Sequence, residues 1–263
     1  MLRYQLGAIP DQPDSRDYDY RRAGAAREAV WKGELPAHVD NRSQCTPVRH
    51  QGDEPSCVGH AISGVAEFLF WKQLRTMPRF SPRAAYNWAR IYDAIPGIIH
   101  DGSTVRGGLR AWHKNGQCPD ECWPYVAGYE GAPCDDVAKL SDDYPLWRYE
   151  RLTGLWEVKH ALHQHGAVVA TVMVHEGWDA PEDNGNDIKP STIENGWHAI
   201  MLSGYDDSRG FLVRNSWGNK WGDGGYAWLP FMDYSLHTHD VWLPLLRQSW
   251  VGPIAEWFRR LIR

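Results

Sequence analysis

The 263-residue sequence has no long hydrophobic run and no excess of positive charge. No apolar segment approaches the roughly 18 residues that a membrane-spanning helix needs, so we expect no such helix. Lysine and arginine number 28 against 33 aspartates and glutamates, which gives a formal net charge of −5. A general nucleic-acid-binding protein normally carries a basic excess, so we expect no nucleic-acid partner.

Cysteine is also scarce, and repeats and low-complexity tracts are absent from the sequence. The five cysteines are Cys45, Cys57, Cys118, Cys122 and Cys134. Their low density argues against a small scaffold built on disulfides, and their odd number leaves at least one thiol free unless it pairs between chains. The N-terminus lacks the apolar core of a signal peptide, so we expect a cytoplasmic location, with non-Sec export left open.

Predicted helices and strands occupy different halves of the chain. Four segments have the apolar period and terminal signals of helices: the stretch from Ser56 onward, 82–94, 105–115 and 155–165. Four later segments are typical of strands: 168–174, 199–202, 211–213 and 225–229. This segregation favours an α+β protein in which a helical lobe packs against a β lobe, and a cleft between lobes is a common place for a site.

Cys57 stands at the first turn of the clearest predicted helix. Backbone N–H groups and the helix dipole stabilise an anion at that place, which lowers a thiol pKa and favours the nucleophilic thiolate. The alternative is that Cys57 is a small buried residue of the helix. Residues elsewhere in the chain decide between the two interpretations.

Three segments in chain order resemble the papain/cathepsin family of cysteine peptidases. The first spans 35–57 and has Gln51 six residues before Cys57, and the second is Trp197-His198-Ala199-Ile200. The third, residues 215–226, reads N-S-W-G-N-K-W-G-D-G-G-Y and is the most specific of the three. The histidine and asparagine of these motifs follow the cysteine at about the 130–150-residue spacing of that family.

The resemblance implies a papain-like α+β fold whose helical lobe packs against a β-barrel-like lobe, with the active-site cleft between them. It implies that Cys57 is the nucleophile, that His198 exchanges protons with it, and that Asn215 orients His198. The Gln51 side chain and the Cys57 N–H would form the oxyanion hole. Trp217 corresponds to an indole that shields the Asn–His hydrogen bond from water, and we group it with the substrate-binding residues.

Gly107 and Gly108 lie where the resemblance places a Gly-Gly segment whose backbone pairs with an extended substrate. The equal alternative is a helix N-terminus that needs small residues. Glu54 is a departure from the family pattern, because it replaces a cysteine that forms a disulfide in secreted relatives. We therefore expect a bacterial-type member without the matching disulfide framework.

The remaining cysteines predict little chemistry. Cys118, Cys122 and Cys134 are expected to form a local disulfide or to be free thiols. A zinc site built from them and nearby histidines is the weaker alternative, because a second cysteine pair at zinc-finger spacing is missing. No metal and no cofactor are expected.

Three parts are expected along the chain. Residues 1–34 form a leader that packs on the domain rather than acting as a full inhibitory pro-segment. Residues 35–243 form the catalytic domain, with a helical lobe at roughly 57–125 and a β lobe at roughly 165–235. Residues 244–263 form an amphipathic helix that docks on the domain or contacts a protein partner or a membrane surface.

The predicted function is hydrolysis of peptide bonds, in a peptide or protein substrate, through a thioacyl intermediate on Cys57. One alternative is transglutaminase- or amidase-like acyl transfer on the same three residues. The other is a non-catalytic, peptide-binding relative. Loss of a triad residue would be its signature, and Cys57, His198 and Asn215 are all present.

Overall fold

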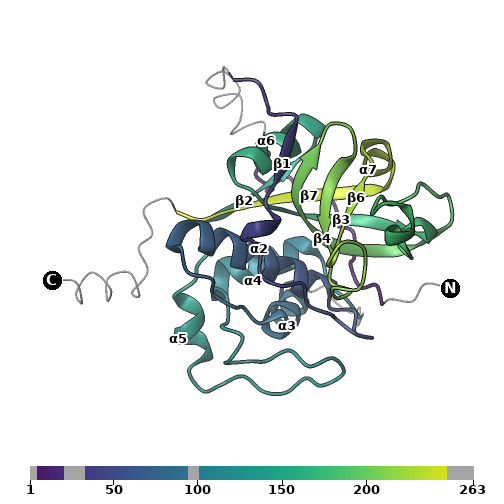
Figure 1. Cartoon of the computed structure of the whole chain (residues 1–263). Coiled ribbons are helices and arrows are strands. Elements are labelled where there is room, and N and C mark those ends of the chain that lie inside the picture. Colours follow the sequence, from purple (N-terminus) through teal and green to yellow (C-terminus); the bar gives the residue numbers. More distant parts are fainter. Residues whose placement is uncertain (1–4, 21–32, 94–100, 248–263) are drawn as a thin grey trace.

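The structure is a computed structural model that describes residues 5–20, 33–93 and 101–247. Helices and strands gather in two lobes, one below the other in Figure 1. The helical lobe contains α2 (Cys57–Leu74), α3 (Pro82–Tyr92), α4 (Val105–Asn115) and α5 (Val137–Asp142). The predicted α+β segregation is thereby confirmed, and none of the described helices is long and apolar enough to cross a membrane.

The second lobe is built on a seven-stranded sheet. Its strands are β1 (His38–Asp40), β2 (Arg148–Leu152), β3 (Val168–His175), β4 (Glu194–Asp206), β5 (Gly210–Arg214), β6 (Tyr226–Leu229) and β7 (Thr238–Leu245). Their order is β2-β7-β3-β4-β5-β6, with β1 paired to β4, and neighbouring strands are antiparallel. The sheet is not a closed barrel, because closure needs β2 to pair with β6 and no ladder joins these strands in the described chain.

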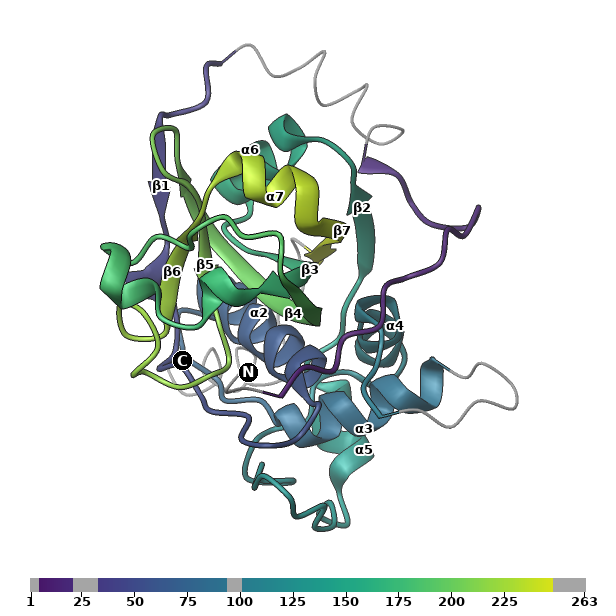
Figure 2. The ribbon, with the colours of Figure 1, turned by 90° about the vertical axis from the view of Figure 1, so that its right-hand side faces the viewer.

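Short helices cover parts of this sheet lobe. They are α6 (Leu155–Gln164), α7 (Phe231–His237) and the 3-10 turns η1 (Arg42–Gln44), η2 (Glu176–Trp178) and η3 (Pro181–Asn184). Figure 2 shows α6 and α7 near one end of the sheet, away from α3 and α4. The face of the sheet that meets the helical lobe is therefore left to α2.

α2 lies between the two lobes and is the central element of the fold. It packs against α3 and α4 on one side and against β3 and β4 on the other. Every residue from Cys57 to Phe70 is buried, so the helix has no solvent face along that stretch. Small residues permit this contact on all sides: a Cβ on Gly59 would lie 2.3 Å from the Pro82 carbonyl oxygen.

The predicted helices at 82–94, 105–115 and 155–165 are confirmed as α3, α4 and α6. Capping residues set two of their starts: the Ser81 hydroxyl accepts the N–H of Ala84, and the Thr104 hydroxyl accepts the N–H of Gly107. All four predicted strands are confirmed as parts of β3, β4, β5 and β6.

Strands β1, β2 and β7 and helices α5 and α7 are missed by the sequence analysis. β7 carries polar residues and Pro244, so its apolar pattern is weak. The expected C-terminal helix at 244–263 is wrong at its start, because β7 continues to Leu245. Its remaining part, 248–263, lies outside the described residues.

Candidate active site

Cys57 is the first residue of α2, and its side chain is fully buried. The net effect of its surroundings is to raise the pKa of its thiol to about 11, and burial is the main cause. The backbone N–H groups of Ala199, Gly7 and Val58 face the sulfur and lower the pKa, but by less than burial raises it. The thiol is therefore protonated at neutral pH in the arrangement that the structure shows. The start of α2 still directs N–H groups at the sulfur, as the sequence analysis expects.

His198 lies on β4, and Asn215 directly follows the neighbouring strand β5. His198 Nε2 is 2.8 Å from Asn215 Oδ1, and the Ser216 N–H donates to the same oxygen over 2.8 Å. Because Asn215 Oδ1 can only accept hydrogen bonds, the ring proton of His198 is assigned to Nε2. His198 Nδ1 is buried without a hydrogen-bond partner among the described residues, so this nitrogen is the one available to the thiol proton.

Cys57 and His198 lie on α2 and β4, which pack against each other at the junction of the two lobes. Ala199, the residue after His198, directs its N–H at the Cys57 sulfur. Burial lowers the pKa of His198 to about 4, against the Asn215 hydrogen bond, which raises it. With the thiol also protonated, the pair is neutral in this arrangement.

Trp217 covers the histidine. Its ring centroid is 4.8 Å from that of His198, and the two planes are inclined by 30°. Trp178 and Trp221 surround Trp217 at 6.3 Å and 5.6 Å between ring centroids. Trp217 is only 1% exposed and lies against the His198 ring, and the substrate contact expected for it stays a prediction.

Gln51 lies in the loop that leads into α2 and is fully buried. Its Oε1 accepts the hydroxyl of Ser216 over 2.6 Å, and its N–H donates to the Ser216 carbonyl over 2.8 Å. The Ser216 bond to Oε1 determines which end of the amide presents N–H groups. Sequence reasoning missed Ser216, although it belongs to the same motif as Asn215 and Trp217.

The expectation that Gly107 and Gly108 pair with substrate is wrong. Both lie inside the first turns of α4, and their N–H groups are already bonded to the hydroxyl and carbonyl of Thr104. A Cβ on Gly107 would lie 1.8 Å from Asp93 Oδ1, so the small side chain serves packing. The alternative interpretation, a helix start that needs small residues, is the one that the structure supports.

Ser103, two residues before α4, has the backbone pairing expected of the glycines. The Ser103 N–H donates to the Gly7 carbonyl over 2.9 Å, and the Ile9 N–H donates to the Ser103 carbonyl over 3.0 Å. From the other lobe, the Trp197 carbonyl accepts the Ala8 N–H over 3.2 Å. The segment 5–9 is therefore held between the two lobes by backbone bonds on both sides.

The same segment lies on the reactive groups. Gln51 Nε2 donates to the Gln5 carbonyl over 3.1 Å, and the Gly7 N–H faces the Cys57 sulfur. Gly7 is needed for this approach, because a Cβ there would lie 2.2 Å from the Pro55 carbonyl oxygen. Figure 2 shows the N-terminal segment running past the start of α2 and on toward α4 and β2.

A sequence profile described as "Papain family cysteine protease" matches residues 35–233. The chain belongs to this family. The match covers all the residues of the site apart from the N-terminal segment that lies on it.

Relatives of the papain family agree with this assignment. A cysteine protease of Blomia tropicalis is 26% identical over 230 residues, with 81% of this chain and 67% of that protein covered. Cathepsin K of Mus musculus is 23% identical over 223 residues, with 76% of this chain and 61% of that protein covered. The chain thus spans about three fifths to two thirds of the length of these curated relatives.

Solved papain-family structures show the same fold. Xylellain, a cysteine protease from Xylella fastidiosa, superimposes with a TM-score of 0.75 at 27% identity, covering 92% of this chain and 96% of its own. Digestive procathepsin L 3 of Tenebrio molitor has a TM-score of 0.65 at 21% identity, covering 82% and 71%. The bacterial-type assignment made from the sequence stays a prediction.

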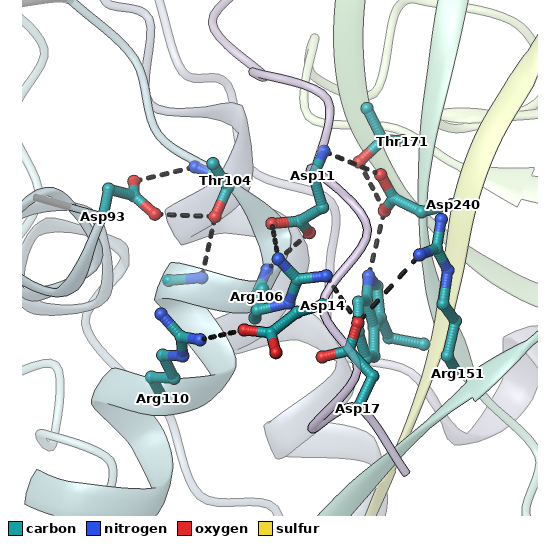
Figure 3. A network of polar contacts seen from close by, with 12 residues as sticks. Asp11, Asp14, Asp17, Asp93, Thr104, Arg106, Arg110, Arg151, Thr171 and Asp240 are labelled. Carbon is teal, nitrogen blue, oxygen red and sulfur yellow. Dashed lines mark hydrogen bonds and ion pairs between the residues drawn. The ribbon is translucent and has the colours of Figure 1, made fainter. Parts of the chain in front are cut away.

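In this papain-family chain, acidic residues of the leader meet arginines of both lobes (Figure 3). Asp17 Oδ2 is 2.6 Å from NH2 of Arg106 on α4 and 4.0 Å from NH1 of Arg151 on β2. Asp14 Oδ2 is 3.4 Å from NH2 of Arg110, one turn along α4. These ion pairs hold residues 11–17 between α4 and the sheet, directly after the segment that covers the site.

Asp11 is the innermost residue of this contact, and its carboxyl is buried beside that of Asp240 on β7. The Arg106 N–H donates to Asp11 Oδ2 over 2.9 Å, and the Asp11 N–H donates to Asp240 Oδ2 over 3.2 Å. Burial first, and then the charge of Asp240, raise the pKa of Asp11 to about 7. Burial raises the pKa of Asp240 as well.

The cysteines outside the site have structural positions. Cys122 and Cys134 form a disulfide with a Cα–Cα distance of 5.0 Å, which is the local pairing that the sequence analysis left open against free thiols. Cys45, Cys57 and Cys118 carry free thiols. A zinc site on Cys118 and these two residues is therefore not supported, because two of its thiolates are joined to each other.

One group of side chains in the described chain has the spacing of metal ligands: His175, Asp233 and His237. The Gly177 N–H donates to His175 Nδ1 over 3.2 Å, so the ring proton sits on Nε2, which donates to Asp233 over 2.9 Å. His237 donates to the second oxygen of Asp233 over 2.8 Å. This is a satisfied hydrogen-bond network that ties α7 to the end of β3.

Proposed function

We propose that this chain hydrolyses peptide bonds in peptide or protein substrates through a thioacyl intermediate on Cys57. The observation that carries the proposal is the state of His198. Its Nε2 is held by Asn215, and its buried Nδ1 lacks a hydrogen-bond partner within the described residues, next to the strand position that contacts the Cys57 sulfur. A histidine with one nitrogen oriented and the other available is suited to take the thiol proton.

The reaction follows from these positions. Cys57 passes its proton to His198 Nδ1, and the sulfur attacks the carbonyl carbon of the substrate. The Gln51 side-chain amide and the Cys57 N–H stabilise the oxyanion, each donor contributing about 3 kcal/mol. The amine then leaves with the proton from His198, and a water molecule, deprotonated by the same nitrogen, hydrolyses the thioester.

Residues 5–9 must leave before a substrate can bind. The Gln5 carbonyl accepts a hydrogen bond from Gln51 Nε2, the donor assigned to the oxyanion hole. The backbone N–H groups of Ala8 and Ile9 are bonded to the two walls of the cleft, where a substrate backbone would pair. The leader is therefore a competitor of substrate. The leader packs on the domain, as expected. These contacts also favour an inhibitory role for it, against the expectation that it does not act as a full inhibitory pro-segment.

The test compares wild type with Cys57→Ala for labelling by a thiol-reactive epoxide or a peptidyl probe and for cleavage of a fluorogenic peptide. We expect labelling and cleavage only in the wild type. Equal labelling of both proteins would refute the assignment of the nucleophile. Adding amine acceptors separates hydrolysis from acyl transfer, since a transferase would give acceptor-dependent products.

We also retain two expectations as proposals: the cytoplasmic location, which rests on the polar N-terminal segment, and the absence of a nucleic-acid partner, which rests on the net charge. Cell fractionation with an antibody against this chain tests the first. A gel-shift titration at low salt tests the second, and specific binding would contradict it.

A further inference from the structure

A cluster of Glu54, Arg83 and Tyr125 lies at the oxyanion loop, residues 51–57; Arg83 is buried and the other two are half-buried. Arg83 comes from the first turn of α3, and only 2% of its surface is exposed. Its NH1 binds Glu54 Oε1, and its NH2 lies 2.6 Å from Oε2. The planar guanidinium thus holds both oxygens of one carboxylate, a geometry that lysine cannot reproduce.

Tyr125 completes the cluster from a loop of the helical lobe. Its ring lies 4.8 Å from the guanidinium carbon of Arg83, in cation–π contact. Its hydroxyl is 2.6 Å from the Gln51 carbonyl oxygen, 3.0 Å from Glu54 Oε2 and 2.8 Å from Ser56 Oγ. Burial raises the pKa of Tyr125, so the hydroxyl keeps the proton that it donates.

Glu54 joins the cluster to the side chain of Gln51. Its carboxylate is held by Arg83, while its carbonyl oxygen accepts Gln51 Nε2 over 2.9 Å. Tyr125 holds the Gln51 carbonyl. Both the main chain and the side chain of Gln51 are therefore bonded to residues that Arg83 organises.

We infer that Arg83 is a positioning residue of the oxyanion hole, which acts through Glu54 and Tyr125 on the Gln51 side-chain amide. The inference rests on the proposed peptidase function, because it assigns Gln51 to an oxyanion. Such a donor must lie 2.7–3.1 Å from the developing charge, and catalytic groups need placement to within about 0.5 Å. Losing a donor costs about 10²–10³-fold in kcat, so misplacing it is expected to cost about tenfold.

The test uses the full chain and the variant Arg83→Met, which keeps the length of the side chain but loses the two-point contact. A peptide aldehyde binds by adding the Cys57 sulfur to its carbonyl carbon, and the thiol proton ends on the oxygen that lies in the oxyanion hole. The matching peptide alcohol occupies the same cleft without that step. We expect Arg83→Met to bind the aldehyde about tenfold more weakly than wild type and to bind the alcohol with an affinity within twofold of wild type.

Two kinetic readouts separate positioning from general damage. In Arg83→Met we expect kcat for a fluorogenic peptide to fall about tenfold with KM within twofold. Alkylation of Cys57 by iodoacetamide forms no oxyanion and is expected to keep its rate. Arg83→Lys, which retains the charge with a single contact, is expected to recover part of the loss.

Arg209→Met is the matched control. Arg209 also binds a carboxylate, with its Nε 2.9 Å from Asp187 Oδ1, and it also lies 4.8 Å from an aromatic ring, that of Trp228. It lies just before β5, in the sheet lobe, and its removal is expected to change neither the aldehyde-to-alcohol ratio nor kcat. If Arg83→Met does not fold, Tyr125→Phe tests the same path with a single atom removed.

Three outcomes would overturn the inference. The first is an aldehyde-to-alcohol affinity ratio that stays unchanged in Arg83→Met and Tyr125→Phe. The second is a Cys57 alkylation rate that falls as much as kcat in Arg83→Met. The third is a fall in kcat or in the affinity ratio of Arg209→Met that is as large as in Arg83→Met. The ratio is a binding measurement, so it is obtained even from a chain that does not turn over. A wild type that binds the aldehyde no better than the alcohol would instead refute the proposed function.

Discussion

At the scale of single residues, the site combines groups whose roles are set by hydrogen bonds that they make elsewhere. Asn215 assigns the proton on His198, and Ser216 assigns the orientation of the Gln51 amide. The carboxylate of Glu54 binds Arg83 of the helical lobe, and its carbonyl oxygen accepts a hydrogen bond from Gln51 Nε2. Glu54, which departs from the family pattern, therefore helps to hold the Gln51 side chain in place.

Gln51→Ala removes the oxyanion-hole side chain. We expect kcat to fall by about 10²–10³-fold, because one preorganised donor to the developing charge is lost. The rate of Cys57 alkylation is expected to stay within a few fold, since that reaction develops no oxyanion. Steady-state kinetics and iodoacetamide inactivation measure the two, and a parallel fall in both would contradict the role of Gln51.

At the scale of elements, the leader is a strand-like insert between the lobes. Ala8 and Ser103 form a bridge, and the hydrogen bonds of Ala8 and Ile9 reach opposite sides of the cleft. Its fit depends on Gly7, which passes against the Pro55 carbonyl where a Cβ would not fit. The element is therefore sensitive to one added methyl group.

Gly7→Ala is expected to displace residues 5–9 and to raise the peptidase activity of the full chain, because the added Cβ would lie 2.2 Å from the Pro55 carbonyl oxygen. Initial rates with a fluorogenic peptide measure the change. Ser15→Ala, an exposed position of the same leader, serves as the control and should leave the rate unchanged. An unchanged or lower rate in Gly7→Ala would argue against leader competition.

The same variant is expected to change the titration of the nucleophile. Burial raises the pKa of Cys57 to about 11 and lowers that of His198 to about 4 while the leader covers them. Uncovering the pair restores solvent and allows the thiolate–imidazolium form at the start of α2. The alkylation rate of Gly7→Ala should persist to lower pH than that of wild type, and superimposable profiles would contradict this.

At the scale of the whole molecule, the charges of the leader connect its docking to pH. Asp11 has its pKa raised to about 7 when docked, against an ordinary value of 3.8, so the docked leader binds the proton more tightly. Docking is then strongest below the ordinary value and weakens as pH rises toward the docked value. The pKa of Asp14 is lowered mainly by Arg16, which belongs to the same leader, so this shift does not depend on docking.

We therefore expect the leader to release its hold as the pH rises from about 4 to 7, by at most about tenfold per pH unit for each proton held by the Asp11–Asp240 pair. The measurement is the alkylation rate of wild type, and separately that of Asp11→Asn, each divided by the rate of Gly7→Ala at the same pH. The thiol titration enters both ratios alike, so the difference between them reports on Asp11. The wild-type ratio should rise with pH. In Asp11→Asn, which stays neutral, the rise should be smaller, and an unaltered rise would refute the role of Asp11.

Much of the site could be predicted from the chain because its motifs are local. Residues 215–226 carry Asn215, Ser216 and Trp217 within a single turn after a strand, and the start of α2 coincides with Cys57. The glycine pair at 107–108 was misplaced because glycine serves helix packing and backbone pairing equally well in a sequence. Whether the sheet closes into a barrel could not be predicted, because closure depends on pairing between strands at distant edges of the sheet.

The amino-acid sequence by itself determined the chemistry that we propose: which side chains we expect to act, in which order they occur, and which helix carries Cys57. Only the tertiary structure decided that the leader lies on Cys57. Its anchors are contacts such as Asp11 to Arg106 and Asp11 to Asp240, separated by 95 and 229 residues. No periodicity or motif encodes such pairs, because they form only after the two lobes have packed around α2.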